Sequence, residues 1–447
     1  EGMVFRCKLD GSEVETLGWN FRNNWMVTVD SFGTIWQSDN DDDGNRGVRI
    51  NYVMEYGNYG YKDEITGAGW RTPRTNLEKI IPLRHWHLND PGVMPNLLQT
   101  GAGSPTGICV YEGDLLPKIF HGQIIHCDAG PSIVRAYPVK PSGAGYTATT
   151  VNILDGAKRD KWFRPSDVKV APDGSLIVAD WYDPGVGGHR MGDLDRGRLF
   201  RITPKGHKGY KQPKLDFSSE KGLLAALNNP NNAVRFAAWT TLKNNMKEGG
   251  REFLSMLKDS NPRNRARAIW LAPVKIAGVD KIAFSHAQKD DDDRIRAMAL
   301  RIARRDKYDM IPLIHKMAND KSPVVRRECL IALRHSKSAE APALWAKLAS
   351  KHDGKDRWYL EALGLAADGQ ENKFFDAWLE STSKLNTPAA RDIIWRCRGT
   401  YAAKYLADII LDKTTPEADK PRYLRALDFI PKSKEKDQAL ARITLGL

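Results

Sequence analysis

A repeat of about 30 residues in the second half of the chain constrains the fold most strongly. Each copy has a polar turn, an apolar residue followed by arginine, and then an amphipathic run rich in alanine. Successive aligned arginines lie 32, 29, 30, 31, 34 and 31 residues apart; they are Arg235, Arg267, Arg296, Arg326, Arg357, Arg391 and Arg422. Such a period with paired helices is typical of an α-solenoid, in which each repeat buries its apolar stripe against its neighbours. The pattern predicts an all-α solenoid of about seven repeats over residues 206–447.

The turns between these helices resemble those of short HEAT-like repeats. Asn229-Pro230, Asn261-Pro262 and Ser322-Pro323 are examples. Proline suits the first turn of a helix, where its missing N–H would have no partner in any case. We expect each repeated arginine to pair with an acidic group of a neighbouring repeat or to bind carbonyl groups at a helix end. Ligand binding by these arginines is the alternative interpretation.

The first half of the chain has a different pattern, which favours strands and tight turns. Residues 27–36 and 168–180 each alternate apolar side chains around a turn, and Asp173-Gly174 forms the tip of the second. Asp-Gly between alternating apolar residues is a strong hairpin signal. Repeated hairpins without helical periodicity predict an all-β propeller over residues 1–205. At about 40–45 residues per blade, this length holds a partial propeller of about four to five blades.

The charge of +13 is carried by the second half. Residues 1–205 hold 23 Lys and Arg against 25 Asp and Glu, whereas residues 206–447 hold 45 against 30. Such a surface attracts acidic proteins, polyanions or anionic lipid, and a solvated solenoid face is the alternative. Without an aromatic and basic platform, we expect no nucleic-acid partner. No stretch approaches the ~18 consecutive apolar residues of a membrane span.

The five cysteines include no C-x-x-C pair, which excludes a zinc ribbon and a covalent haem site. Cys109 and Cys127 lie in expected strands. We expect two buried free thiols there, with a disulfide as the alternative.

An acidic segment, residues 38–47, follows the first of these hairpins. Its carboxylate and amide side chains crowd oxygen atoms in a way that a hard cation would neutralise. We predict a Ca²⁺ site whose ligands are Asp39, Asp41, Asp43 and Asn45. The spacing departs from that of an EF-hand, because Ile50 stands where the last glutamate is needed. The alternative is a turn-rich loop satisfied by its own amides and by Arg46 and Arg49.

Two further segments combine polar and aromatic residues. Asp180–His189 follows a strand, and its Trp181 and His189 suit the wall of a ligand pocket, with an inter-blade packing loop as the alternative. His85-Trp86-His87 would place two imidazoles on one side of an extended chain. Metal binding and packing are the two alternative interpretations of this histidine pair.

Three stretches together resemble the propeller family of soluble glucose and sorbosone dehydrogenases. They are residues 18–61, residues 104–122 and residues 163–202, in the order and rough spacing of that family. With its helical repeats, the chain is most similar to the large planctomycete-type proteins classed as membrane-bound dehydrogenases, which fuse such a propeller to HEAT repeats.

The resemblance implies a quinoprotein-type oxidoreductase that acts on a sugar or alcohol, with pyrroloquinoline quinone (PQQ) and Ca²⁺ as cofactors. It places the cation and quinone near the acidic loop, with Arg164 facing the quinone, and implies five cofactor-binding residues: Arg164, Asn40, Gly44, Trp181 and His189. It also implies a periplasmic or extracellular protein, associated with a membrane through its partners. The solenoid would dock a protein partner such as a c-type cytochrome or haem module.

The chain departs from that family in ways that bear on activity. The family's catalytic histidine lies on an early blade, so we expect the base before residue 1, in a protein whose N-terminus is processed or truncated. The haem motif of the longer relatives is absent from this sequence. A noncatalytic carbohydrate-binding or protein-binding scaffold is therefore the alternative function.

Overall fold

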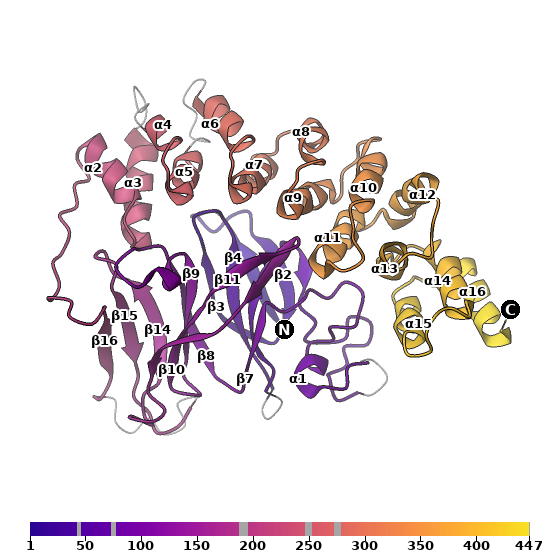
Figure 1. The fold of residues 1–447 in the computed structure, drawn as a ribbon, viewed down its shortest axis with the longest axis horizontal. Helices are drawn as coiled ribbons and strands as arrows, with labels where there is room; N and C mark the ends of the chain where they lie inside the picture. Colours follow the sequence, from indigo (N-terminus) through magenta and orange to yellow (C-terminus); the bar gives the residue numbers. More distant parts are fainter. Residues whose placement is uncertain (43–45, 73–76, 187–194, 246–252, 272–278, 447) are drawn as a thin grey trace.

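The computed structural model describes residues 1–42, 46–72, 77–186, 195–245, 253–271 and 279–446. Its strands lie between Gly2 and Ile202, and its long helices lie between Glu220 and Leu445. Figure 1 shows the sheets as the lower body and the helices as an arch that passes over them. The predicted multidomain fold, a sheet-rich part followed by a helical solenoid, is confirmed.

The strands of the described residues form four sheets of three or four strands and one separate hairpin. The first sheet has β1 (Gly2–Arg6), β2 (Glu15–Phe21) and β6 (Gly57–Asn58), and the second has β3 (Asn23–Val29), β4 (Ile35–Asn40), β5 (Val48–Tyr52) and β7 (Leu98–Gly101). The third has β8 (Pro105–Tyr111), β9 (Gln123–Asp128), β10 (Ile133–Tyr137) and β13 (Val151–Asp155), and the fourth has β14 (Pro165–Val170), β15 (Leu176–Asp180) and β16 (Arg198–Ile202).

The first strands of successive sheets lie side by side, so the sheets follow one another as propeller blades do. β3 packs on β8, and β8 packs on β14. Within the last three sheets every strand pairs antiparallel with the next. β4 continues beyond the hairpin predicted over residues 27–36: Asn40 pairs with Asn23 on β3, and Asp39 pairs with Arg49 on β5.

The separate hairpin reaches from the sheets into the helices. It has β11 (Val139–Ser142) and β12 (Gly145–Ala148), and in Figure 1 it points toward α11. At its tip, the Ala144 N–H donates to Asp356 Oδ2 at 2.6 Å, and the Ala144 carbonyl accepts a hydrogen bond from Arg327. The hairpin thereby fastens the sheet-rich part to the solenoid.

The short helix α1 (Ile81–Arg84) corrects one expectation about the first half. His85 directly follows α1 in helical conformation, and His87 has a φ of 47°. The backbone bends here because Pro82 supports a first helical turn, so His85-Trp86-His87 is not extended. The two imidazoles consequently make separate contacts, and His87 Nδ1 lies 2.9 Å from the Gly60 carbonyl.

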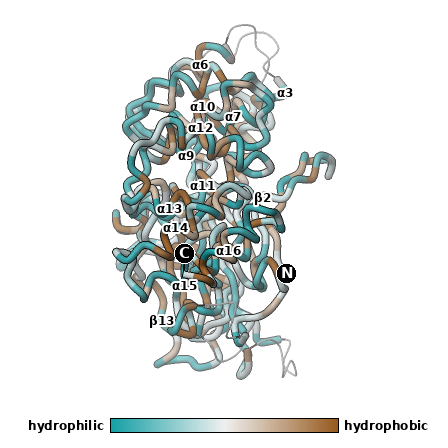
Figure 2. Tube along the Cα trace, turned by 90° about the vertical axis from the view of Figure 1, so that its right-hand side faces the viewer, coloured by the Kyte–Doolittle hydropathy of each residue, from teal (hydrophilic) through white to brown (hydrophobic). Residues whose placement is uncertain are grey.

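The helices of the second half follow one another along the chain, and α2 contacts α3, α4 contacts α5, α6 contacts α7, and α8 contacts α9. They are α2 (Glu220–Leu227), α3 (Asn232–Asn245), α4 (Phe253–Met256), α5 (Pro262–Ile269), α6 (Val279–Ala287), α7 (Asp293–Arg305), α8 (Met310–Met317), α9 (Pro323–Leu333), α10 (Ala341–Ala349), α11 (Arg357–Ala367), α12 (Glu371–Ser381), α13 (Pro388–Arg396), α14 (Ala402–Leu411), α15 (Lys420–Asp428) and α16 (Lys434–Leu445). In Figure 2 the apolar segments lie largely inside the stack of helices. No helix in the described part is long and apolar enough to cross a bilayer.

The polar turns start helices as expected. Asn261, Ser322 and Thr387 each cap a helix with their side chain, and a proline follows each of them as the first helical residue. Such caps satisfy backbone N–H groups that have no partner inside the helix.

The repeated arginines bind carbonyl groups and neighbouring acids. Three of them, Arg235, Arg296 and Arg326, donate to the carbonyls six and five residues earlier. In the second repeat Arg265 makes this contact in place of the aligned Arg267. Arg265 and Arg296 also pair with Asp290 and Asp320 in the next repeat. The alignment of Arg267 was therefore wrong by two residues, because three arginines fall within five positions there and the sequence does not distinguish them.

Other solenoid arginines bind the sheet-rich part. Arg267 lies 3.2 Å from Glu112, and Arg301 donates to the Phe32 carbonyl at 3.1 Å. Farther along, Arg398 pairs with Glu64 at 2.7 Å, and Arg425 pairs with Asp90 at 2.9 Å and with Asp63. Part of the basic excess of the solenoid is thus neutralised inside this chain.

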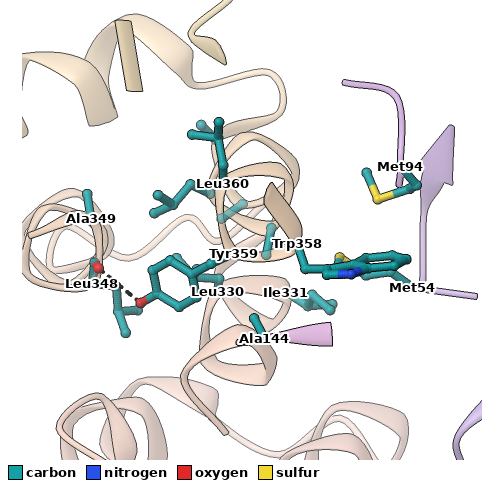
Figure 3. Close-up of a cluster of buried hydrophobic side chains, with 14 of the residues drawn as sticks. Met54, Met94, Ala144, Leu330, Ile331, Leu348, Ala349, Trp358, Tyr359 and Leu360 are labelled. Carbon is teal, nitrogen blue, oxygen red and sulfur yellow. Dashed lines mark hydrogen bonds between the residues drawn. The ribbon is translucent and has the colours of Figure 1, made fainter. Parts of the chain in front are cut away.

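An apolar core is continuous between the two parts. Trp358 on α11 packs between Met54, Met94 and the Ala144 tip, while Tyr359 lies among the helices and donates to the Leu348 carbonyl at 2.9 Å (Figure 3). Cys109 and Cys127 are buried free thiols, as expected.

Candidate functional site

One carboxylate clamp recurs at the end of the second strand in three sheets. It is formed by Asp39, Asp128 and Asp180. Each accepts a hydrogen bond from an amide near the start of the first strand of its sheet, donated by Asn23, Ser104 and Arg164 respectively, at 2.7–2.8 Å. Each also faces an arginine of the third strand, and these are Arg49, Arg135 and Arg198. The clamp ties the strands of each blade together at the end that points away from the solenoid.

Asp39, a predicted Ca²⁺ ligand, is committed to this clamp. Its side chain is fully buried, and Oδ2 lies 2.8 Å from Arg49 Nη2 and 3.3 Å from the backbone nitrogen of Arg22. Burial raises the pKa of Asp39, while Arg49 acts in the opposite direction. The charge of Asp39 is therefore balanced by Arg49, and its oxygens do not fit a cation site.

Asn40 and Asp41 follow at the same strand end. Asp41 Oδ2 accepts a hydrogen bond from the Gly47 N–H at 2.6 Å, and the buried amide oxygen of Asn40 has no hydrogen-bond partner among the described residues. The described residues contain no group of three His, Cys, Asp or Glu side chains placed to hold a metal. Asp43, Gly44 and Asn45 lie outside the described residues, so the Ca²⁺ loop stays a prediction.

Arg164 and Trp181 lie together at the corresponding end of the fourth sheet, where the backbone N–H of Trp181 donates to the Arg164 carbonyl at 3.1 Å. The Arg164 guanidinium is buried; it donates to Ser132 Oγ at 2.6 Å and to the Pro184 carbonyl at 3.2 Å. These contacts join two turns, but the buried Arg164 Nε has no hydrogen-bond partner among the described residues, so its role toward a quinone stays a prediction. His189 lies outside the described residues.

Four side chains, in an arrangement that the sequence did not predict, surround Asp42. The carboxylate accepts hydrogen bonds from Arg22 Nε at 3.2 Å, Tyr61 Oη at 3.3 Å and Trp70 Nε1 at 3.2 Å. His85 Nδ1 lies 3.8 Å from Asp42 Oδ2. We call Arg22, Asp42, Tyr61, Trp70 and His85 the Asp42 cluster.

The Asp42 cluster remains open to solvent on one side. The side chains of Asp42 and Arg22 are 31% and 24% exposed, whereas His85 is fully buried. Burial lowers the pKa of His85 to about 3, against the opposing effect of Asp42. Burial alone would raise the pKa of Asp42, but His85 and Arg22 lower it on balance. At neutral pH the cluster presents an ionised carboxylate beside a neutral imidazole.

This combination of groups suits a ligand that carries several hydroxyls. A half-exposed carboxylate accepts hydrogen bonds from hydroxyl groups, a guanidinium donates to them, and aromatic rings cover the apolar face of a sugar ring. A base with a pKa near 3 is weak at neutral pH. His85 is therefore suited to hydrogen bonding and poorly suited to proton abstraction.

Comparisons with known proteins agree with the two-part architecture. Residues 1–206 match the model of a domain of unknown function (DUF7133), and residues 282–364 match the model of HEAT repeats. The HEAT match bears out the predicted solenoid type. No curated protein matches the chain.

Solved structures resemble parts of the chain. One is an oxidoreductase (glucose dehydrogenase) from Thermus thermophilus, with 18% identity, 42% of this chain and 47% of that chain covered, and a TM-score of 0.30. Another is the PQQ-bound aldose sugar dehydrogenase of Streptomyces coelicolor, with 17% identity, 45% and 52% covered, and a TM-score of 0.31. The chain thus spans about half the length of these dehydrogenases.

Proposed function

We propose that this chain binds a sugar or polyol at the Asp42 cluster. The observation that carries the proposal is the convergence of Arg22, Tyr61, Trp70 and His85 on one half-exposed carboxylate. These residues come from separate segments, between β2 and β3 and between β6 and β7, so the fold brings them together. The Asp42 side chain is 31% exposed, so a ligand can reach it from solvent.

A calorimetric titration with a panel of monosaccharides and polyols tests this proposal. We expect Asp42→Asn to weaken binding of the best ligand by about tenfold or more, because hydrogen bonds to a charged group are lost. Asp114→Asn removes an exposed aspartate elsewhere in the sheets and should leave affinity unchanged. Equal affinity of parent and Asp42→Asn would contradict the assignment.

The aromatic part of the cluster is tested separately. Trp70→Ala should weaken the same ligand, whereas Trp162→Ala, which removes another partly exposed tryptophan of the sheet-rich part, should not. Loss of affinity in both variants would indicate a general effect on the fold.

The second candidate is a quinoprotein-type oxidoreductase that acts on the bound sugar or alcohol. The resemblance to glucose and sorbosone dehydrogenases supports this candidate. The same proposal includes export of the protein and a c-type cytochrome or haem module bound to the solenoid. Asp39, however, is engaged by Arg49 and does not fit the predicted role toward Ca²⁺, and the role of Arg164 toward the quinone stays a prediction. We therefore place binding before catalysis.

Reconstitution with Ca²⁺ and PQQ distinguishes the two candidates. Sugar-dependent reduction of an electron-accepting dye, lowered by Asp42→Asn, would establish the oxidoreductase. Sugar binding without quinone absorbance or dye reduction would leave a noncatalytic carbohydrate-binding scaffold.

A further inference from the structure

A cavity of about 930 Å³ lies between the sheets and the first helices of the solenoid. One wall comes from the first strands of three sheets, β3, β8 and β14, and the other comes from α3 and α5. β3 runs from Asn23, beside the Asp42 cluster, to Val29 at this cavity. Met26, the first residue of this strand that lines the cavity, is three residues or about 10 Å from Asn23, and no residue of the Asp42 cluster is among the described residues that line the cavity.

The cavity is apolar on both walls. Val27 and Val29 of β3 are 44% and 52% exposed, and Phe236 of α3 is 51% exposed. Trp239, three residues after Phe236, lies on the same face of α3 and also lines the cavity. Large apolar side chains left open beside such a cavity mark a binding site.

The charged groups around the cavity are mainly basic. Lys169, Arg235, Arg267 and Arg305 line it, against Asp30 alone among the acids. Arg235 and Arg267 both form ion pairs with the buried Glu112, at 3.1 and 3.2 Å. The Lys169 and Arg305 side chains are 57% and 40% exposed, and their ion pairs with Asp167 and Asp306 lie at the surface. Exposed pairs of this kind stabilise little, so both cations can turn to a ligand.

We propose that this cavity binds an amphipathic carboxylate, whose apolar chain lies between β3 and α3 and whose carboxylate binds Lys169 or Arg305. The size fits, because cavities of ~300–1,000 Å³ hold small organic ligands. Charge complementarity selects an anion over a neutral or cationic compound. The buried Cys109 thiol at the wall takes no part, since burial raises its pKa to about 12.

Binding can be measured on the full chain with the uncharged fluorescent probe N-phenyl-1-naphthylamine and two competitors, decanoate and 1-decanol. We expect the probe to bind and decanoate to displace it at concentrations about tenfold lower than decanol, because only decanoate offers a carboxylate to the basic rim. Failure of the probe to bind, or equal displacement by both competitors, would overturn the proposal.

Three variants test whether the probe and decanoate bind in this cavity. Val29→Glu puts a charge on the apolar wall and should weaken probe and decanoate about tenfold or more. Trp25→Glu makes a comparable change at a 62% exposed residue on the same face of β3 that does not line the cavity, and it should have no effect. Lys169→Ala combined with Arg305→Ala should remove the preference for decanoate and leave probe binding intact. Equal losses in Val29→Glu and Trp25→Glu, or an unchanged preference in the double variant, would contradict this site.

Discussion

Arg49 and Asp39 form a fully buried ion pair at the end of β4 and β5. Removing one member of such a pair leaves the other charge buried without compensation, which typically costs about 3–5 kcal/mol. We therefore predict that Arg49→Met lowers the free energy of unfolding by about that amount in urea denaturation. Arg46→Met, at an exposed arginine of the same segment, is the control and should change little. Equal stability of the two variants would show that Asp39 is not held as described.

Asp128 makes the stability of the fold depend on pH with the opposite sign to that of most aspartates. Burial raises its pKa to about 6, against ~3.9 in an unfolded chain. The folded state binds the Asp128 proton more tightly than the unfolded chain does. The contribution of Asp128 to stability is therefore present below pH ~4 and is lost as the pH rises through about 6.

Asp128→Asn removes this titration. We predict that the stability of the variant, relative to the parent, rises by about 2–3 kcal/mol between pH ~4 and ~7, as measured by urea denaturation at each pH. Asp155→Asn, at an exposed position of the same sheet, controls for the loss of one negative charge. A relative stability that falls with pH would show that Asp128 is stabilised as an anion.

The sequence located the candidate site only in part, for a reason that is visible at individual residues. The crowding of acids in residues 38–47 directed attention to the strand end that also carries Asp42, yet it favoured Asp39 over Asp42. The partners of Asp42 are Arg22, Tyr61, Trp70 and His85, which lie 19–43 residues away in sequence. Their convergence is a property of the folded chain, and no local pattern in the sequence reports it.

At the scale of elements, the β11–β12 hairpin depends on a glycine at its tip. A Cβ on Gly145 would lie 2.2 Å from the Trp358 ring, so the hairpin could reach α11 only if one of them moved. We predict that Gly145→Ala lowers the free energy of unfolding by about 1–3 kcal/mol. Gly69→Ala has room for the added methyl and should be neutral. Comparable destabilisation by both variants would argue against close packing at the tip.

Elements with local signals were predictable, and elements set by distant contacts were not. The solenoid helices carry their own caps and prolines, as at Ser322-Pro323, so a single repeat contains the information for its fold. The β3–β4 and β14–β15 hairpins carry turn residues at their tips. By contrast, the position of β11–β12 depends on Arg327 and Asp356, which lie 183 and 212 residues from Ala144 in sequence.

At the scale of the whole molecule, the solenoid is held on the sheets by buried ion pairs. Arg425 pairs with Asp63 and Asp90, all three of them buried. We predict that Arg425→Met destabilises the chain by about 3–5 kcal/mol, because two carboxylates lose their cation. Arg442→Met breaks an exposed pair with Asp408 inside the solenoid and should cost at most about 1 kcal/mol. Similar values for the two variants would show that the contact between the parts contributes little to stability.

A crystal structure with the tightest-binding sugar or polyol tests the central claim most directly. The account predicts electron density for the ligand at the Asp42 cluster, with ligand hydroxyls within hydrogen-bond distance of the Asp42 carboxylate and the ring beside Tyr61 or Trp70. Ligand density elsewhere on the molecule, with the Asp42 cluster unchanged from the free protein, would contradict it.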